Sequence, residues 1–396
     1  MTHAGGRDRY LDALRALAIA RVVVFHMFSL TWLTYALPAM GVMFALGGSL
    51  MAASLERSGA RAIRGRVRRL LPALWVMGLI VVPVMIWQGW TPDVPSLFLW
   101  VVPLADPPGS DWAADATVVL WYLVTYLWLV LLSPAAWWLF RRLPLLAIAL
   151  PLAVLAITQA GPIADALSDS RAGAVVIDVA TYGACWCAGF AHRTGALRRL
   201  RLPLLLGLAA GLIAAGAGWA VTHPGEDGAG NLNDIPLGNA LYSLGFVLLV
   251  LRAAPAMGWL RRIRPLDALV TLLNARAVTI YLWHNVAIAL CFAVGDRLQV
   301  WKLGPALIQD GYFAVALVLL AVAVLALGWV EDVAARRRPA LLPWAPPPRR
   351  RAPAPRHAAA PVPRGATPVA ATPQPAVQQS AGSNGPATST PGFTIS

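Results

Sequence analysis

Long apolar runs dominate the hydrophobic pattern of this sequence. Ten runs, separated by charged, Pro-rich or Gly-rich residues, are each about as long as a helix needs to cross a hydrocarbon core of roughly 30 Å. They cover residues 11–30, 37–55, 70–88, 117–139, 144–160, 173–191, 202–222, 237–251, 277–294 and 306–329. The pattern predicts an all-α integral membrane protein with about ten transmembrane helices.

Positive charges are distributed very unevenly over the segments between these runs. If the N-terminus is cytoplasmic, 27 of the 32 Lys and Arg residues fall on the cytoplasmic side. Arg171, Arg297 and Lys302 fall on the opposite side, and Arg15 and Arg21 lie within the first span. The positive-inside rule therefore predicts a multi-pass protein of the cell membrane with both termini in the cytoplasm.

Composition excludes a soluble globular enzyme, because 58% of the residues are hydrophobic and only 13% are charged. The net charge of +14 reflects topology rather than nucleic-acid binding, since the basic residues are scattered and form no recognisable nucleic-acid module. The three cysteines all lie in apolar runs and have no zinc-ligand spacing. We expect no bound metal.

The chain divides into two parts by composition. Residues 1–338 contain all the apolar runs and are predicted to form one membrane domain. Residues 339–396 are rich in Pro, Ala, Ser and Thr and are predicted to be a disordered cytoplasmic tail. An alternative for the tail is a surface-bound segment in which Arg349, Arg350 and Arg351 meet anionic lipid headgroups.

Two ionisable residues share one face of the first predicted span. Arg15 and His26 are 11 residues apart, which on a helix is three turns plus about 20°, with a separation of about 16 Å. A cation near the cytoplasmic end suits an anionic ligand, and a neutral imidazole deeper in the membrane suits a general base. The alternatives are a snorkelling anchor for Arg15 and an interhelical hydrogen bond for His26.

Other polar residues in or beside the spans have two interpretations each. The run Arg61, Arg64, Arg66, Arg68 and Arg69 forms either cytoplasmic anchors or a cationic rim for phosphate groups. His284, placed near the outer half of the ninth span, is either a substrate-side hydrogen-bond partner or a core residue. For Asp178 and Arg21 we favour structural roles in helix packing and ion pairing.

Five short segments then support a family resemblance. They are Tyr10–Ala18 with Val24-Phe25-His26, Gly41–Leu50, Arg68–Pro72, Leu120–Leu123 and Tyr281–His284. In this order they resemble the membrane-bound acyltransferase 3 family, and the Arg15 to His26 spacing matches its motif of arginine, ten residues and histidine. The resemblance covers residues 7 to 338. One departure is Gly47-Gly48-Ser49, where the family usually has a Phe-Phe, then Ser-Gly pattern.

The resemblance implies transfer of an acyl group, acetyl or another short chain, from cytoplasmic acyl-CoA to a hydroxyl of a carbohydrate, envelope glycan, lipid or secondary metabolite. His26 is then the expected catalytic base and His284 the second catalytic candidate. Arg15, Arg68 and Arg69 are expected to bind acyl-CoA. Aromatic residues expected on the acceptor side are Trp121, Tyr122 and Trp283. No bound cofactor is expected, and we expect a stand-alone enzyme without the hydrolase-like domain of many members.

Two other classes of protein remain open at this stage. A polytopic transporter or flippase would use the intramembrane His and Arg residues as proton or anion sites, although we find no internal repeat. A non-catalytic membrane scaffold is the other class, but it does not explain why Arg15 and His26 share one helical face.

Overall fold

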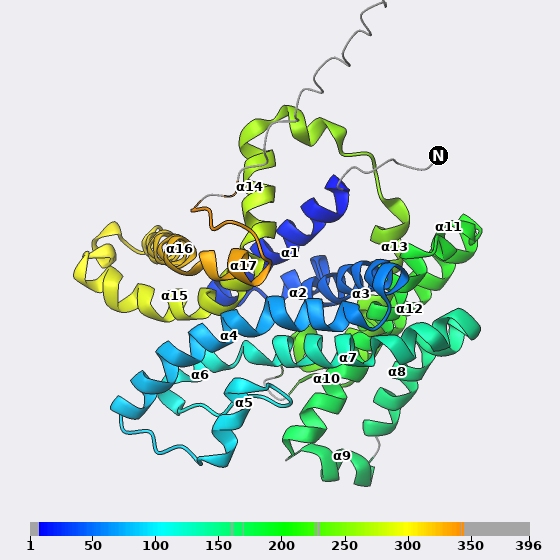
Figure 1. Ribbon diagram of the computed structural model, residues 1–396, viewed down its shortest axis with the longest axis horizontal. Helices are drawn as coiled ribbons and strands as arrows, with labels where there is room; N and C mark the ends of the chain where they lie inside the picture. Colours follow the sequence, from blue (N-terminus) through cyan, green and yellow to red (C-terminus); the bar gives the residue numbers. More distant parts are fainter. Residues whose placement is uncertain are drawn as a thin grey trace, which may run out of the picture. The chain divides into compact units, whose positions relative to one another are not determined.

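The computed structural model describes residues 8–159, 161–168, 170–225, 228, 230–341 and 343. Every regular element within these ranges is a helix, which confirms the predicted all-α class (Figure 1). Almost all of the predicted tail, residues 339–396, lies outside the described residues. At its start, however, Ala340 is held by the membrane domain, because its N–H donates to Asp332 and its carbonyl accepts from Arg276.

Each of the ten predicted runs contains a long helix. These are α1 (Arg9–Phe28), α3 (Ala39–Ser58), α4 (Arg61–Trp87), α7 (Leu120–Arg142), α8 (Pro144–Thr158), α10 (Arg171–Arg193), α12 (Leu202–Thr222), α13 (Pro236–Ala253), α15 (Ala277–Arg297) and α16 (Ile308–Leu327). Short α-helices lie between them: α2 (Trp32–Ala36), α5 (Phe98–Val101), α6 (Ala114–Thr117), α9 (Gly161–Ser168), α11 (Ala196–Arg199), α14 (Arg264–Ala275) and α17 (Trp329–Ala334). The 3₁₀ turns are η1 (Pro95–Leu97), η2 (Asp111–Ala113), η3 (Leu232–Asp234), η4 (Gly258–Arg262) and η5 (Val300–Leu303).

Eight segments of the described chain are long and apolar enough to cross a membrane. Helices α1 and α8 are not among them. Helix α1 carries Asp12, Arg15 and Arg21 within its length, and α8 has only 15 residues. The protein is therefore a helical membrane protein, while the number of ten spans and their orientation stay predictions.

Helix α4 begins nine residues before the predicted start of its span. The arginine-rich stretch from Arg61 to Arg69, which lies between two of the predicted spans, forms its first turns. Arginine is a good helix former, so a charged stretch that adjoins an apolar run continues the helix instead of interrupting it. As a result the arginines of this stretch project in fixed directions set by the helical period.

The centre of the domain is built by two helices that approach unusually closely, α3 and α10. Nearly all of the middle of α3 is buried. A Cβ atom at Gly48 would lie 2.1 Å from the backbone oxygen of Trp186, and one at Gly189 would lie 2.1 Å from that of Ala45. Such glycines allow helix backbones to pack closely in a membrane, and Gly48 and Gly189 do so here.

Gly48→Ala is expected to push α3 and α10 apart and to destabilise the domain by about 1–3 kcal/mol, as overpacking does in other cores. Thermal unfolding of the purified protein in detergent measures this effect. Gly207→Ala on α12 is the matched control, because a Cβ there meets no atom within 4 Å. Equal melting temperatures for the two variants would contradict the packing described.

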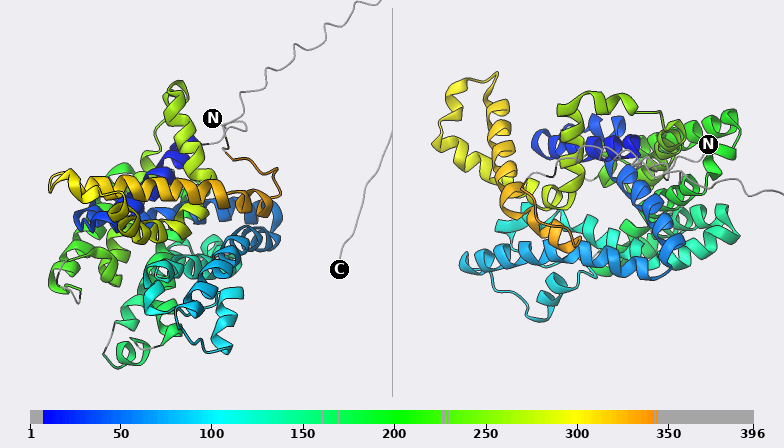
Figure 2. Two further views of the ribbon diagram at one scale, coloured as in Figure 1. Left: turned by 90° about the vertical axis from the view of Figure 1, so that its left-hand side faces the viewer. Right: turned by 45° about the horizontal axis from the view of Figure 1, so that its top comes forward.

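Helices α15 and α16 lie side by side in both views of Figure 2, and α1 packs against α3 and α15. Helix α17 packs on α4. These contacts bring the beginning, middle and end of the described chain together. They place residues of α1, α4, α15 and α17 around one cavity.

The predicted orientation is testable with reporter fusions. A fusion after Arg338 is expected to report a cytoplasmic location, and one in the segment between α12 and α13, near Asp227, an extracytoplasmic location, because of the distribution of Lys and Arg. Opposite signals from either fusion would show the topology to be wrong.

Candidate active site

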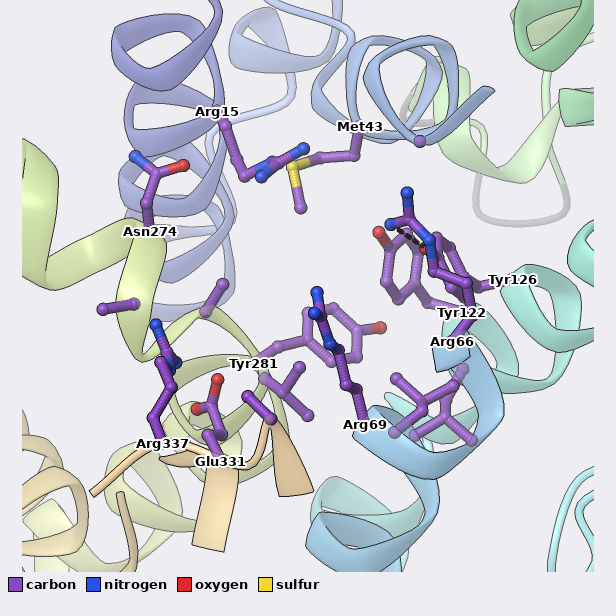
Figure 3. A pocket seen from close by; sticks show the side chains of 17 residues that line it. Arg15, Met43, Arg66, Arg69, Tyr122, Tyr126, Asn274, Tyr281, Glu331 and Arg337 are labelled. Carbon is purple, nitrogen blue, oxygen red and sulfur yellow. Dashed lines mark hydrogen bonds between the residues drawn. The ribbon is translucent and has the colours of Figure 1, made fainter. Parts of the chain in front are cut away.

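A cavity of about 450 Å³ lies between the cytoplasmic-facing parts of the predicted topology. Its lining comes from α1, α3, α4, α7, the junction of α14 and α15, and the segment from α17 onward (Figure 3). Four arginines line it: Arg15, Arg66, Arg69 and Arg337. The other polar lining residues are Tyr122, Tyr126, Asn274, Tyr281 and Glu331.

The cavity carries excess positive charge. Arg66 donates hydrogen bonds to the Tyr126 hydroxyl at 3.2 Å and to Ser54, and Arg337 pairs with Asp332 at 3.2 Å. Within the described residues, Arg15 and Arg69 make neither a hydrogen bond nor an ion pair, although both point toward the centre of the cavity in Figure 3. Unpaired guanidinium groups in a concave site favour an anionic ligand.

Glu331 is the one carboxylate among the described lining residues, and it is already engaged. It accepts hydrogen bonds from the backbone N–H of Thr279 at 2.7 Å and from its hydroxyl at 2.6 Å, and so caps the start of α15. Burial raises the pKa of this carboxyl, while the Thr279 hydrogen bonds and the charge of Arg276 oppose the shift. The main contacts of Glu331 are therefore these hydrogen bonds to the start of α15, and the positive charge of Arg15 and Arg69 in the cavity stays without a paired carboxylate among the described residues.

The wall formed by α17 is fixed by buried ionic contacts. Arg276, which is fully buried, donates to Asp332 at 2.8 Å, and Arg68 donates to the carbonyl of Ala334 at 3.3 Å. Burial opposes ionisation of Asp332, but the hydrogen bonds from Arg276 and Ala340 lower the pKa of its carboxyl. Arg68, expected above to bind acyl-CoA, therefore anchors α17 and does not line the cavity.

The two histidines singled out in the sequence are brought together. The ring centroids of His26 and His284 are 5.0 Å apart, in an edge-to-face arrangement. His284 donates from Nδ1 to the carbonyl of Tyr281 at 2.7 Å, so in the neutral ring Nε2 is the acceptor. That Nε2 is buried without a hydrogen-bond partner among the described residues, whereas His26 is exposed in the last turn of α1.

Two tyrosines connect the arginine cavity to the histidine pair. Tyr122 and Tyr281 both line the cavity, and their ring centroids are 4.7 Å apart. The Tyr281 ring lies 5.8 Å from that of His284, and its hydroxyl donates to the carbonyl of Val119 at 2.6 Å. His26 and His284 themselves do not line the cavity. The ring of Tyr281 lies between the cavity and His284, and His26 contacts His284.

The position of His284 along its helix differs from the expectation. It is the eighth residue of α15, which has 21 residues, and so lies in the first half of the helix. The ninth span of a chain with a cytoplasmic N-terminus starts on the cytoplasmic side, so this half is the inner one in the predicted topology. The placement near the outer half was wrong for that reason.

The remaining aromatic candidates lie apart from the cavity lining. Trp121 stacks on Tyr182 with ring centroids 5.6 Å apart. Trp283 packs against the apolar clusters beside α15. Of the three aromatic candidates, only Tyr122 is among the described residues that line the cavity with the arginines.

Sequence reasoning missed several residues of the site. Arg66 belonged to the arginine run considered as a cationic rim, but it was not chosen as a site residue because α4 was expected to start later. From a start at Arg61, the helical period puts Arg66 and Arg69 on one face and Arg68 on another. Tyr126 was also missed, although it follows the candidate Tyr122 by about one helical turn. Asn274 and Arg337 gave no signal, since they reach the cavity only through the tertiary fold. The Oδ1 atom of Asn274 is buried there without a partner among the described residues.

The fold and this site define a helical membrane protein with a cationic cavity that leads to a pair of histidines. The family described as an acyltransferase domain, acyltransferase 3, matches residues 8–330. The chain belongs to this family and is an acyltransferase. No curated protein and no solved structure matches the chain.

Proposed function

We propose that this acyltransferase takes its acyl group from a cytoplasmic acyl-CoA. Coenzyme A carries several phosphate charges, and the planar fork of arginine binds phosphate oxygens in pairs. Arg15 and Arg69 have no partner among the described residues and face one cavity. The proposal rests on one observation: side chains in successive contact connect the arginine cavity to the histidines. Tyr122 contacts Tyr281, and Tyr281 contacts His284.

In the proposed reaction His26 acts as the general base. It takes the proton from an acceptor hydroxyl while that oxygen attacks the thioester carbonyl carbon. The carbon–sulfur bond then breaks, the CoA thiolate leaves, and the proton on His26 is passed on to it. Such general-base assistance typically contributes 10²- to 10⁴-fold. An acyl-histidine intermediate is the alternative for the same residue.

The acceptor is proposed to be a hydroxyl of a carbohydrate, envelope glycan, lipid or secondary metabolite. His26 is exposed near the end of α1 that the topology prediction puts on the outer side, so an acceptor has access to it without entering the arginine cavity. The acyl arm has to pass Tyr122 and Tyr281 from the cytoplasmic side. We propose the cell membrane as the location.

The proposal is tested with the full chain in lipid nanodiscs, supplied with labelled acetyl-CoA and a panel of hydroxyl acceptors. We expect release of free CoA thiol that depends on an acceptor, and label transferred to that acceptor. His26→Ala serves as the inactive comparison. Movement of labelled substrate across vesicle membranes without cleavage of the thioester would instead support a transporter and contradict the proposal.

A further inference from the structure

A second concave site lies outside the catalytic region, between α7, α8 and α10. Figure 1 draws these three helices next to one another, and α10 packs on both of the others. The groove has a volume of about 960 Å³. Several of its lining residues are exposed, among them Leu132, Leu150 and Val176, so it opens to the outside of the domain.

The groove is apolar along nearly its whole length. Two of the three indole N–H groups in its lining donate inside the protein, Trp128 to the carbonyl of Leu104 at 2.8 Å and Trp186 to the Ser133 hydroxyl at 3.0 Å. Its lining on α10 extends from Arg171 to Cys187, which is about 24 Å along a helix. One leaflet fills about half of the roughly 30 Å hydrocarbon core, so the groove is long enough for one lipid chain to lie along it.

One end of the groove carries a positive charge. Arg171 is the charged residue among those described in the lining, it is exposed, and it makes no hydrogen bond or ion pair within the described chain. Burial raises the pKa of the neighbouring Asp106, and the charge of Arg171 opposes this shift, but no ion pair joins the two. The predicted topology places Arg171 on the outer side, at the level of lipid headgroups.

The groove is separate from the arginine cavity. The fully buried Trp186 lies between them, because it lines the groove and also packs against Gly47 and Tyr126, which line the cavity. An acyl chain that enters the cavity with a donor substrate therefore has no open path into the groove. Its occupant has to come from the membrane.

We propose that this groove binds one acyl chain of an anionic phospholipid, with the lipid phosphate held by Arg171. The apolar walls exclude polar ligands, and an arginine without a protein partner is stabilised by a phosphate at the membrane surface. The inference rests on the groove alone and does not depend on the chemistry of acyl transfer.

The test uses the full chain in nanodiscs made of equal amounts of phosphatidylglycerol and phosphatidylcholine with identical acyl chains. Native mass spectrometry after release into detergent identifies the retained lipids. We expect phosphatidylglycerol to be retained about fivefold more than phosphatidylcholine, as one arginine contact predicts. Arg171→Gln is expected to remove this preference, and Ala135→Trp, which fills the groove from α7, to remove retention.

Matched variants outside the groove control for general effects. Arg297→Gln removes a charge on the same predicted side, and Leu145→Trp adds an indole at an exposed position of α8 that does not line the groove. Both are expected to retain lipid as the unmodified protein does. Equal retention of the two lipids, or an unchanged preference in Arg171→Gln, would overturn the proposal even if Ala135→Trp fails to fold.

Discussion

His26→Ala is expected to lower kcat by about 10²- to 10⁴-fold while leaving CoA binding nearly unchanged. The imidazole acts only when the acceptor hydroxyl attacks, so its loss removes stabilisation of the transition state and not of the bound donor. Single-turnover transfer from labelled acetyl-CoA measures kcat, and titration with CoA measures binding.

His223→Ala is the matched control for this prediction, because His223 is exposed, stacks on Trp219 and lies outside the cavity lining. It is expected to keep full turnover. If His26→Ala also keeps it in a correctly folded protein, the proposed mechanism is wrong, and His284, with its unpartnered Nε2, becomes the base to test. Label that stays on the unmodified enzyme without acceptor would favour an acyl-histidine intermediate over general-base catalysis.

Arg15→Ala is expected to raise the KM for acetyl-CoA by about 10- to 100-fold with a small change in kcat, as the loss of one charge-assisted hydrogen bond to phosphate predicts. Arg15→Lys is expected to restore only part of the affinity, because lysine lacks the planar fork. Steady-state kinetics over a range of acetyl-CoA concentrations gives both constants.

S-acetylpantetheine provides the control that isolates the phosphate contact. It has the same thioester but no phosphate groups, so Arg15→Ala is expected to leave its KM unchanged. Arg141→Ala, which removes an exposed arginine outside the cavity, is expected to leave the KM for acetyl-CoA unchanged. An equal loss with both thioesters in Arg15→Ala would mean that Arg15 acts on folding or on the acyl arm and not on phosphate.

The hydrophobic pattern was sufficient to predict the long helices, because each span has to be apolar to reside in lipid. The pattern was insufficient where a stretch of charged residues is itself helical. The start of α4 was placed too late because its arginines were assigned to the segment between two spans, and α14 was not expected within the charged stretch 252–276. Helix α14 carries its polar residues mainly on one face, whereas the arginines of α4 point to more than one face. In both places the mean composition of the stretch conceals the helix.

The site was predictable only where its residues share one element. Arg15 and His26 follow from the helical period of a single span, and Arg69 from its place beside an apolar run. The contact of His26 with His284 joins α1 to α15, and Arg337 reaches the cavity only through the anchoring of α17 by Arg276. Contacts between residues so far apart in the sequence depend on tertiary packing, which local patterns do not specify.

A structure of the full chain bound to a thioether analogue of acetyl-CoA, which resists cleavage, tests the central claim most directly. We predict phosphate oxygens within hydrogen-bond distance of Arg15 and Arg69, and the carbonyl-equivalent carbon beyond Tyr122 and Tyr281, next to His26. Phosphates bound away from these arginines, or a reactive carbon remote from both histidines, would contradict the account.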